Sequence, residues 1–199
     1  SNITIVKENN KLSELISKDI GPGNCLIDNW VRINSNKKFD QGGRLALSGT
    51  KNEIILEQAQ ELYIKRNEKK KMSLDTNDFD VSFARGLSLE DGVATLTDFT
   101  ARIISEELSL SLKNSKEKIL EILVCGGGRK NTVLLQKIKK NLSSDITLRL
   151  IDDYKIDGDF VESQAFAFLA IRSVQGLPIS FPNTTGCKIP CVGGELIKN

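Results

Sequence analysis

Histidine is absent from this sequence of 199 residues, and aromatic residues make up only 6% of it. Without imidazole, the chain has no histidine base, nucleophile or metal ligand, which excludes Ser-His-Asp triads and histidine-based zinc sites. Any proton transfer must therefore depend on carboxylates, Lys, Tyr or Cys.

Long hydrophobic runs and a strong net charge are also missing. No apolar run approaches the roughly 18 residues that a membrane span requires. Lys and Arg number 28 against 26 for Asp and Glu, and a formal net charge of +2 is too small to indicate nucleic acid or an acidic membrane as a partner. The composition, 39% hydrophobic and 27% charged, is typical of a globular protein of one large or two small domains.

Cysteine is sparse, with Cys25, Cys125, Cys187 and Cys191 unevenly spread along the chain. A chain of this size does not depend on disulfides, and no charged-then-apolar signal segment opens it, so we expect a reducing cytoplasm. Cys187 and Cys191 could form half of a metal site, but the other two cysteines lack a matching spacing and no histidine can complete a tetrahedron. We therefore predict that this pair binds no metal.

The first half of the chain shows a hairpin pattern and three helical patterns. Residues 3–6 alternate, and Leu12, Leu15 and Ile16 are the expected partner strand. A loop, Asp19–Asn24, precedes a helix with Asn24 as its N-cap. The apolar residues of the expected helices are Leu26, Ile27, Trp30 and Val31; then Ile55, Ala59, Leu62 and Tyr63; then, after an N-cap at Ser88, Val93, Leu96, Thr100, Ile103 and Ile104.

The second half predicts strands that alternate with helices. A buried strand over 119–124 leads into Gly126–Gly128 and a helix with Leu134, Leu135, Ile138 and Leu142 on one face, and a second strand follows over 146–151. This order indicates α/β layering with a parallel pair of strands. The nearly all-apolar helix over 160–174 is expected to supply part of the core.

The glycine run Gly126–Gly128 and two carboxylates are the residues that could carry chemistry. Glycines between a strand and a helix let an anionic ligand approach the backbone, but tight turns use glycine for the same freedom, so both interpretations stay open. Asp19 stands before a rigid turn, where it could act on a ligand or bond to turn amides. Glu162 lies within an apolar helix and must face solvent, a partner or a polar cavity, because burying an unpaired charge is costly.

Five blocks, in this order, resemble the anhydro-N-acetylmuramic acid kinase family. They are Asp19–Asn24, Ser73–Asp75 with Phe79, Leu87–Ala101, Val124–Asn131, and Ile156–Asp159 with Glu162, Ala165 and Phe166. The resemblance extends over the whole chain. One departure is Ile20, where the family usually has Thr.

The resemblance implies an α/β, actin-like (ribonuclease H-like) sugar-kinase fold with added helices. Residues 1–199 look like the second domain of a two-domain kinase, with a helical insertion over about 41–115. The amino-terminal half of the pattern, with its phosphate loop and most sugar contacts, is missing from the chain. The family further suggests a homodimer, while the small net charge and the lack of a long apolar run predict no nucleic acid or membrane partner.

The family reaction uses water to open the 1,6-anhydro bridge of anhydro-N-acetylmuramic acid, while the freed O6 takes the γ-phosphoryl group of ATP. By motif position, Asp19 matches the base and Glu162 the acid that helps to hold the water. Gly126, Gly127, Gly128 and Asn131 match the adenosine loop, and Gly21, Gly23 and Asn24 match the substrate loop. Mg²⁺ is expected to bridge the phosphates without direct protein ligands.

Two other readings remain open at this point. The chain could be a non-catalytic ATP-binding module of the same fold, or part of a kinase for another sugar. Retention of both Asp19 and Glu162 favours the enzyme, because a binding module does not need two carboxylates for water activation.

Overall fold

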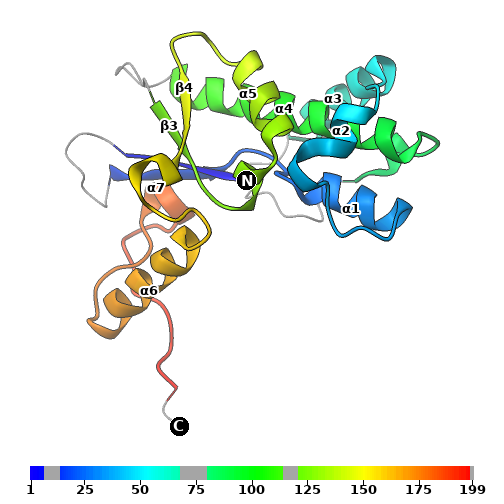
Figure 1. Cartoon of the computed structure of the whole chain (residues 1–199). Helices are drawn as coiled ribbons and strands as arrows, with labels where there is room; N and C mark the ends of the chain where they lie inside the picture. The colour runs from blue at the N-terminus through cyan, green and yellow to red at the C-terminus, as the bar shows by residue number, and fades with distance from the viewer. Residues whose placement is uncertain (7–13, 68–79, 114–120, 198–199) are drawn as a thin grey trace.

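A computed structural model describes residues 1–6, 14–67, 80–113 and 121–197 (Figure 1). Leu12 of the expected hairpin, the Ser73–Asp75 block with Phe79, and residues 119–120 of the expected strand lie outside the described residues. The α-helices are α1 (Cys25–Asn34), α2 (Arg44–Ser48), α3 (Glu53–Asn67), α4 (Leu89–Lys113), α5 (Thr132–Asn141), α6 (Val161–Val174) and α7 (Pro182–Thr185). The strands are β1 (Asn2–Ile5), β2 (Ile16–Asp19), β3 (Glu121–Val124) and β4 (Thr147–Leu150). Short 3₁₀ turns are η2 (Gln41–Gly43), η4 (Ser82–Ala84), η5 (Gly127–Lys130) and η6 (Ile151–Tyr154).

The predicted hairpin is confirmed, with a later second strand. β1 and β2 pair antiparallel, with Asn2 opposite Asp19 and Ile5 opposite Ile16. The partner strand therefore begins at Ile16, whereas the expected strand ended there. This register places Asp19 at the end of β2, directly before the loop that leads to α1.

Helix α1 has the predicted face, because Leu26, Ile27, Trp30 and Val31 are all buried. The prediction that the side chain of Asn24 caps this helix is wrong. Asn24 occupies the N-cap position with helical backbone angles, φ −81° and ψ −6°, and its side chain makes no capping bond. Capping usually needs an extended backbone, which aims the side-chain oxygen at the first free amides of the helix.

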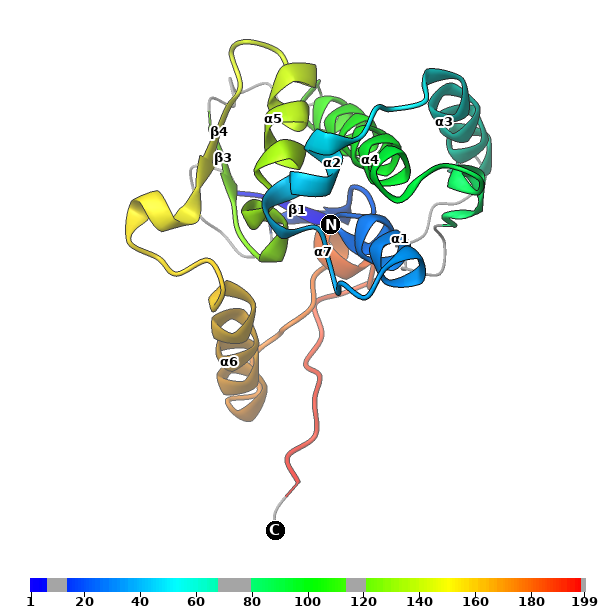
Figure 2. The ribbon, with the colours of Figure 1, turned by 45° about the vertical axis from the view of Figure 1, so that its right-hand side comes forward.

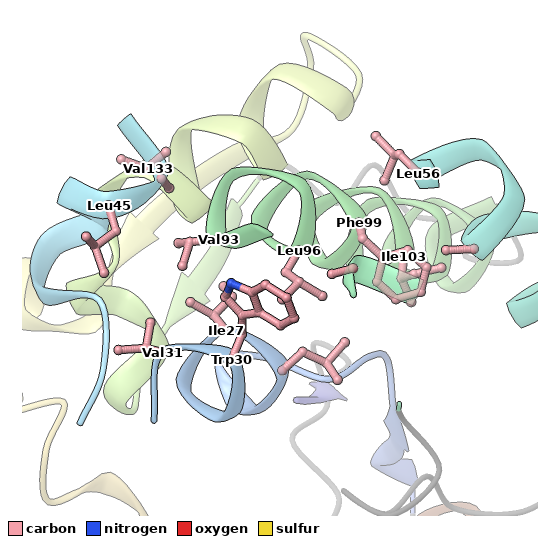
Figure 3. Packing of buried hydrophobic residues seen from close by; sticks show 14 residues of the cluster. Ile27, Trp30, Val31, Leu45, Leu56, Val93, Leu96, Phe99, Ile103 and Val133 are labelled. Carbon is pink, nitrogen blue, oxygen red and sulfur yellow. The ribbon is translucent and has the colours of Figure 1, made fainter. Parts of the chain in front are cut away.

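The central element is α4, which begins as predicted: Ser88 Oγ accepts a hydrogen bond from the Asp91 amide at 3.1 Å. The residues of its predicted apolar face are all buried. Val93, Leu96 and Ile103 pack with residues of α1, α2 and α3 (Figure 3), whereas Ile104 belongs to a second cluster that includes α5. The face predicted for α3 is partly wrong, since Leu56 is fully buried while Leu62 is exposed. The helix is rotated so that Leu56, Ala59 and Tyr63, which are spaced by three and four residues, face α4.

The predicted parallel pair is confirmed, because β3 and β4 pair parallel with Glu121 opposite Thr147. A second apolar cluster joins inward residues of both strand pairs to α4 and α5, including Ile3, Ile122, Leu148, Ile104 and Leu134. The described residues thus form a mixed α/β structure with two small sheets. In the described residues 41–67 and 80–113, the chain forms two short turns and three helices, which are η2, α2, α3, η4 and α4.

The expectation that the apolar helix over 160–174 contributes to the core is wrong. None of the residues of α6 is buried, and Phe166 is 65% exposed. Figures 1 and 2 show α6 extending away from α1–α5, so its apolar side chains have no core surface to cover them. In the parts of the chain that are described, no helix has the length and apolar character to cross a membrane.

Candidate active site

The glycine run forms the turn between β3 and α5. Gly126 has φ 75° and ψ −179°, a conformation that residues with a side chain rarely adopt, and η5 follows from Gly127. The backbone conformation therefore explains glycine at position 126.

Gly127 and Gly128 have no such explanation in the fold. Neither has a positive φ, and a Cβ atom added at either position would meet no described atom within 4 Å. Neither strain nor packing among the described residues thus demands glycine there. Close approach of a ligand to the backbone is a physical reason that remains for these two glycines.

Asn131 connects this turn to the Asp19–Asn24 loop. It is buried, and its Oδ1 accepts a hydrogen bond from the Leu134 amide at 3.1 Å, which caps α5. Its Nδ2 donates to Asn24 Oδ1 at 3.4 Å. The structure thus brings the predicted nucleotide loop and the predicted substrate loop together through two amide side chains.

The glycines of the substrate loop are required by the fold. Gly21 has φ 150°, and a Cβ there would lie 2.9 Å from Cγ1 of Ile104 on α4. Gly23 has φ 60°. Ile20, where the family usually has Thr, is buried in the second apolar cluster, so it anchors this loop rather than presenting a hydroxyl.

The η2 turn is a neighbour of the glycine run that sequence reasoning did not find. Thr132 Oγ1 donates to the Gly42 carbonyl at 3.0 Å, and a Cβ on Gly43 would lie 2.4 Å from Cγ2 of Val133. Asp40 accepts hydrogen bonds from the Leu45 and Ala46 amides, which holds η2 against α2. The pair Gly42–Gly43 was the available signal for this close contact.

The structure does not place Glu162 in the cluster formed by Asn24, Asn131 and η2. Glu162 is exposed in the first turn of α6. Sequence reasoning expected it to face solvent, a partner or a polar cavity, and an exposed position agrees with this. Asp19 is partly buried at the end of β2.

Arg129 was not predicted as a functional residue, yet it is the best-buried cation near the glycine run. Its side chain is 7% exposed and contacts Asp152 at 2.8 Å and Asp159 at 2.6 Å. Hydrogen bonds from Arg129 and then from Lys130 lower the pKa of Asp159 to about 2, and the bond from Arg129 also lowers the pKa of Asp152. An arginine next to glycines, followed by four aspartates between 152 and 159, was the signal for this network.

Direct metal ligation has no donor set in the described part of the chain, where no three His, Cys, Asp or Glu side chains gather in a way that could hold a metal ion. The four cysteines are free thiols. Desolvation, and then the neighbouring Cys187 thiol, raises the pKa of Cys191, which favours the protonated form. The absence of zinc at this pair stays a prediction.

Comparison with known proteins decides the family. The whole chain, residues 1–199, matches the family described as anhydro-N-acetylmuramic acid kinase. The chain belongs to this family. Relatives named anhydro-N-acetylmuramic acid kinase include one from Pelagibacter ubique, 51% identical over 199 residues, which cover 100% of this chain and 53% of the relative. Others from Zymomonas mobilis and Caulobacter vibrioides are each 36% identical, over 92% and 99% of this chain and 48% and 50% of the relatives.

The chain therefore spans about half the length of the curated relatives that it matches. The matched half contains the Asp19–Asn24 loop, the glycine run and Glu162.

Proposed function

We propose that this chain is the second, ATP-binding half of a kinase that opens 1,6-anhydro-N-acetylmuramic acid with water and phosphorylates its O6. Family membership supports the reaction class. The nucleotide is placed beside Gly127 and Gly128 because the described fold does not require glycine at either position. Without side chains, these two residues leave the backbone accessible to a ligand. The amides that follow this turn, at the start of α5, favour an anionic group.

Asp19 is the proposed general base. Its carboxylate accepts a proton from water as the water oxygen bonds to the anomeric carbon and the bond from that carbon to O6 breaks. The freed O6 bonds to the γ-phosphorus, the bond from that phosphorus to the bridging oxygen breaks, and the products are N-acetylmuramic acid 6-phosphate and ADP. A carboxylate base suits a chain without histidine.

Glu162 is proposed to orient the same water, and Gly21, Gly23 and Asn24 to form the loop beside the sugar. Gly126 and Asn131 shape the nucleotide turn, since Gly126 takes its strained backbone conformation and Asn131 fastens the turn to both α5 and Asn24. The hydrogen bond between Asn24 and Asn131 supports a common site for the two loops.

ATP and Mg²⁺ are the proposed co-substrate and metal. The open backbone at Gly127 and Gly128 fits a phosphate or nucleotide group, and the described residues offer no carboxylate cluster for a metal. Mg²⁺ is therefore assigned to the nucleotide phosphates, where it neutralises charge during phosphoryl transfer.

The remaining parts of the proposal concern the whole protein. The amino-terminal half of the family pattern supplies the phosphate loop and most sugar contacts, and the two halves form an actin-like fold that closes over both substrates. The protein is cytoplasmic, works in peptidoglycan recycling and forms a homodimer. Its partners are ATP and the sugar, with no nucleic acid and no membrane.

The test measures product formation with ATP, Mg²⁺ and the anhydro sugar. We expect no turnover by the 199-residue chain and robust turnover when the missing half is present, because phosphoryl transfer requires positioning and charge stabilisation from both sides of the phosphates. Turnover by this chain alone would overturn the two-domain proposal. ATP binding without turnover in the two-domain protein would favour the non-catalytic module, and turnover of a different sugar would change the assigned substrate.

A glycine variant tests the nucleotide turn itself. In the two-domain protein, Gly127→Val adds a side chain in open space, so we expect an unchanged melting temperature. The apparent KM for ATP should rise by at least about tenfold, because a loss of binding that is equal in the ground state and the transition state raises KM. Thr147→Val, at an exposed position of β4, is the matched control. A normal KM for ATP in Gly127→Val would remove the turn from the nucleotide site.

A further inference from the structure

Arg129 lies at the centre of an ionic network that joins two separate segments of the chain. Its Nε donates to Asp152 Oδ2 at 2.8 Å and its Nη2 to Asp152 Oδ1 at 3.1 Å, so the guanidinium holds this carboxylate with two bonds. Its Nη1 donates to Asp159 Oδ1 at 2.6 Å. The network therefore ties the turn after β3 to both ends of the 152–159 segment.

Backbone contacts strengthen the same connection. Arg129 Nη1 also donates to the Gly126 carbonyl at 3.1 Å, and the Gly126 amide donates to the Gly158 carbonyl at 3.0 Å. A Cβ on Gly158 would lie 2.5 Å from Arg129 Nε. Glycine at 158 therefore makes room for the guanidinium.

The connection leads directly to Glu162. Asp159 stands two residues before α6, and Glu162 is in the first turn of that helix. None of the residues of α6 is buried. At its C-terminal end, Arg172 donates to the Pro178 carbonyl at 2.8 Å and Ser173 donates to the Gly193 carbonyl. The bonds at Gly126 and Arg129 connect the start of α6 to the turn that carries Gly127 and Gly128.

The chemistry of arginine explains why this residue type occupies the position. A planar guanidinium holds one carboxylate with two parallel bonds while a further N–H reaches a second carboxylate, which an ammonium group cannot do with the same geometry. The cation is buried and therefore needs these partners, since an unpaired buried charge is costly. Both carboxylates are ionised at neutral pH, and the lowered pKa of Asp159 and of Asp152 keeps them ionised in more acidic solution than an ordinary Asp.

We propose that Arg129 is a positioning residue that holds the glycine turn and the first turn of α6 in one fixed relative placement, so that the nucleotide and the Glu162 carboxylate act on the same substrate. This inference rests on the proposed function for the roles of the turn and of Glu162. The mechanical link itself is independent of that function.

The first experiment measures amide hydrogen exchange in the 199-residue chain. In Arg129→Met, the backbone amides at positions 126, 129, 160 and 164 are expected to exchange at least about tenfold faster, while those of α4 stay unchanged. Arg149→Met is the matched control, because Arg149 is an exposed arginine on β4 that pairs with Glu121 at 2.9 Å. Unchanged exchange in either the turn or the start of α6 would overturn the link.

The second experiment is a double-mutant cycle in the two-domain kinase. We expect Arg129→Met to raise KM for ATP and to lower kcat by about ten- to a hundredfold, a size typical of displaced reacting groups. Glu162→Gln should then cost at least about fivefold less in the Arg129→Met background than in the wild type, because the carboxylate is already displaced. Arg149→Met should leave both constants unchanged.

The outcomes separate the two proposals. Additive effects of Arg129→Met and Glu162→Gln would overturn the coupling to Glu162. A fully active Glu162→Gln variant would instead remove Glu162 from the proposed function, and the exchange data alone then decide the role of Arg129. If Arg129→Met fails to fold, Arg129→Lys replaces it. This variant keeps the positive charge but loses the pair of hydrogen bonds to Asp152. Wild-type amide exchange and wild-type kinetics in Arg129→Lys would overturn the proposal.

Discussion

Apolar side chains on α4 and on α6 have opposite environments. Val93 and Leu96 on α4 are fully buried, whereas Phe166 and Val174 on α6 are 65% and 69% exposed. Both segments are helical and both are rich in apolar residues. The comparison teaches that apolar content sets the tendency of a helix to be buried, but burial itself requires a complementary surface in the same structure.

The residues of the candidate site also differ in whether they lie next to the packed helices or on the exposed helix. Asp19, Asn24 and the glycine run are fastened to α4 and α5, while Glu162 begins the exposed helix α6. The geometry between the two carboxylates therefore depends on connecting segments, among them the 152–159 segment with its hydrogen bonds to Arg129, because no residue of α6 is buried.

Loss of the proposed base Asp19, which lies at the end of β2, is expected to have the largest effect. In the two-domain kinase, Asp19→Asn should lower kcat by about 10²- to 10⁴-fold with little change in the affinity for ATP, because the amide keeps the shape but cannot accept a proton. Steady-state kinetics measure this, with Asp153→Asn as an exposed control. Near-normal turnover would remove Asp19 from the base role.

A pair of truncations tests the comparison between the helices directly. In the 199-residue chain, which we expect to fold alone around its two apolar clusters, Leu96→Ala should lower the free energy of unfolding by about 2–5 kcal/mol, because it leaves a cavity in the core. Phe166→Ala should change it by less than about 0.5 kcal/mol, as exposed substitutions usually do. Urea unfolding compares the two, and equal losses would contradict the difference in burial.

Acid should weaken the link between the two regions. The pKa of Asp159 falls from 3.8 to about 2 on folding, so the unfolded chain binds more protons between these values. The contribution of Asp159 to stability is therefore complete above pH 3.8 and is lost as the pH falls towards about 2. Between pH 3.8 and about 2, the free energy of unfolding should depend less on pH in Asp159→Asn than in the wild type, and Asp153→Asn should follow the wild type. Urea unfolding at several pH values measures this. The same pH dependence in all three proteins would argue against the ion pair.

The smallest expected effect concerns Cys187 and Cys191, near the exposed end of the chain. Replacing both with Ser should leave the zinc content of the purified protein unchanged at background level, because two thiols without further ligands form an incomplete site. Metal analysis checks this, and stoichiometric zinc in the wild type that disappears in the variant would contradict it.

Much of the site could be predicted as local pieces. The Ser88 cap, the buried face of α1, and the order of strand, glycine turn and helix all follow from patterns within about a dozen residues, which local backbone geometry dictates. Asn24 shows where such reasoning ends: its residue type and position predicted a cap, but its oxygen accepts a hydrogen bond from Asn131, 107 residues away.

The sequence by itself determined which segments are helical, where the glycine turns lie and which carboxylates stand beside them, because periodicity, caps and backbone freedom are local properties. Only the tertiary structure decided that Asn24 meets Asn131, that Arg129 grips Asp152 and Asp159, and that α6 leaves its apolar residues exposed. These outcomes depend on which surfaces meet, and the pattern of one segment contains no information about the shape and charge of a distant one.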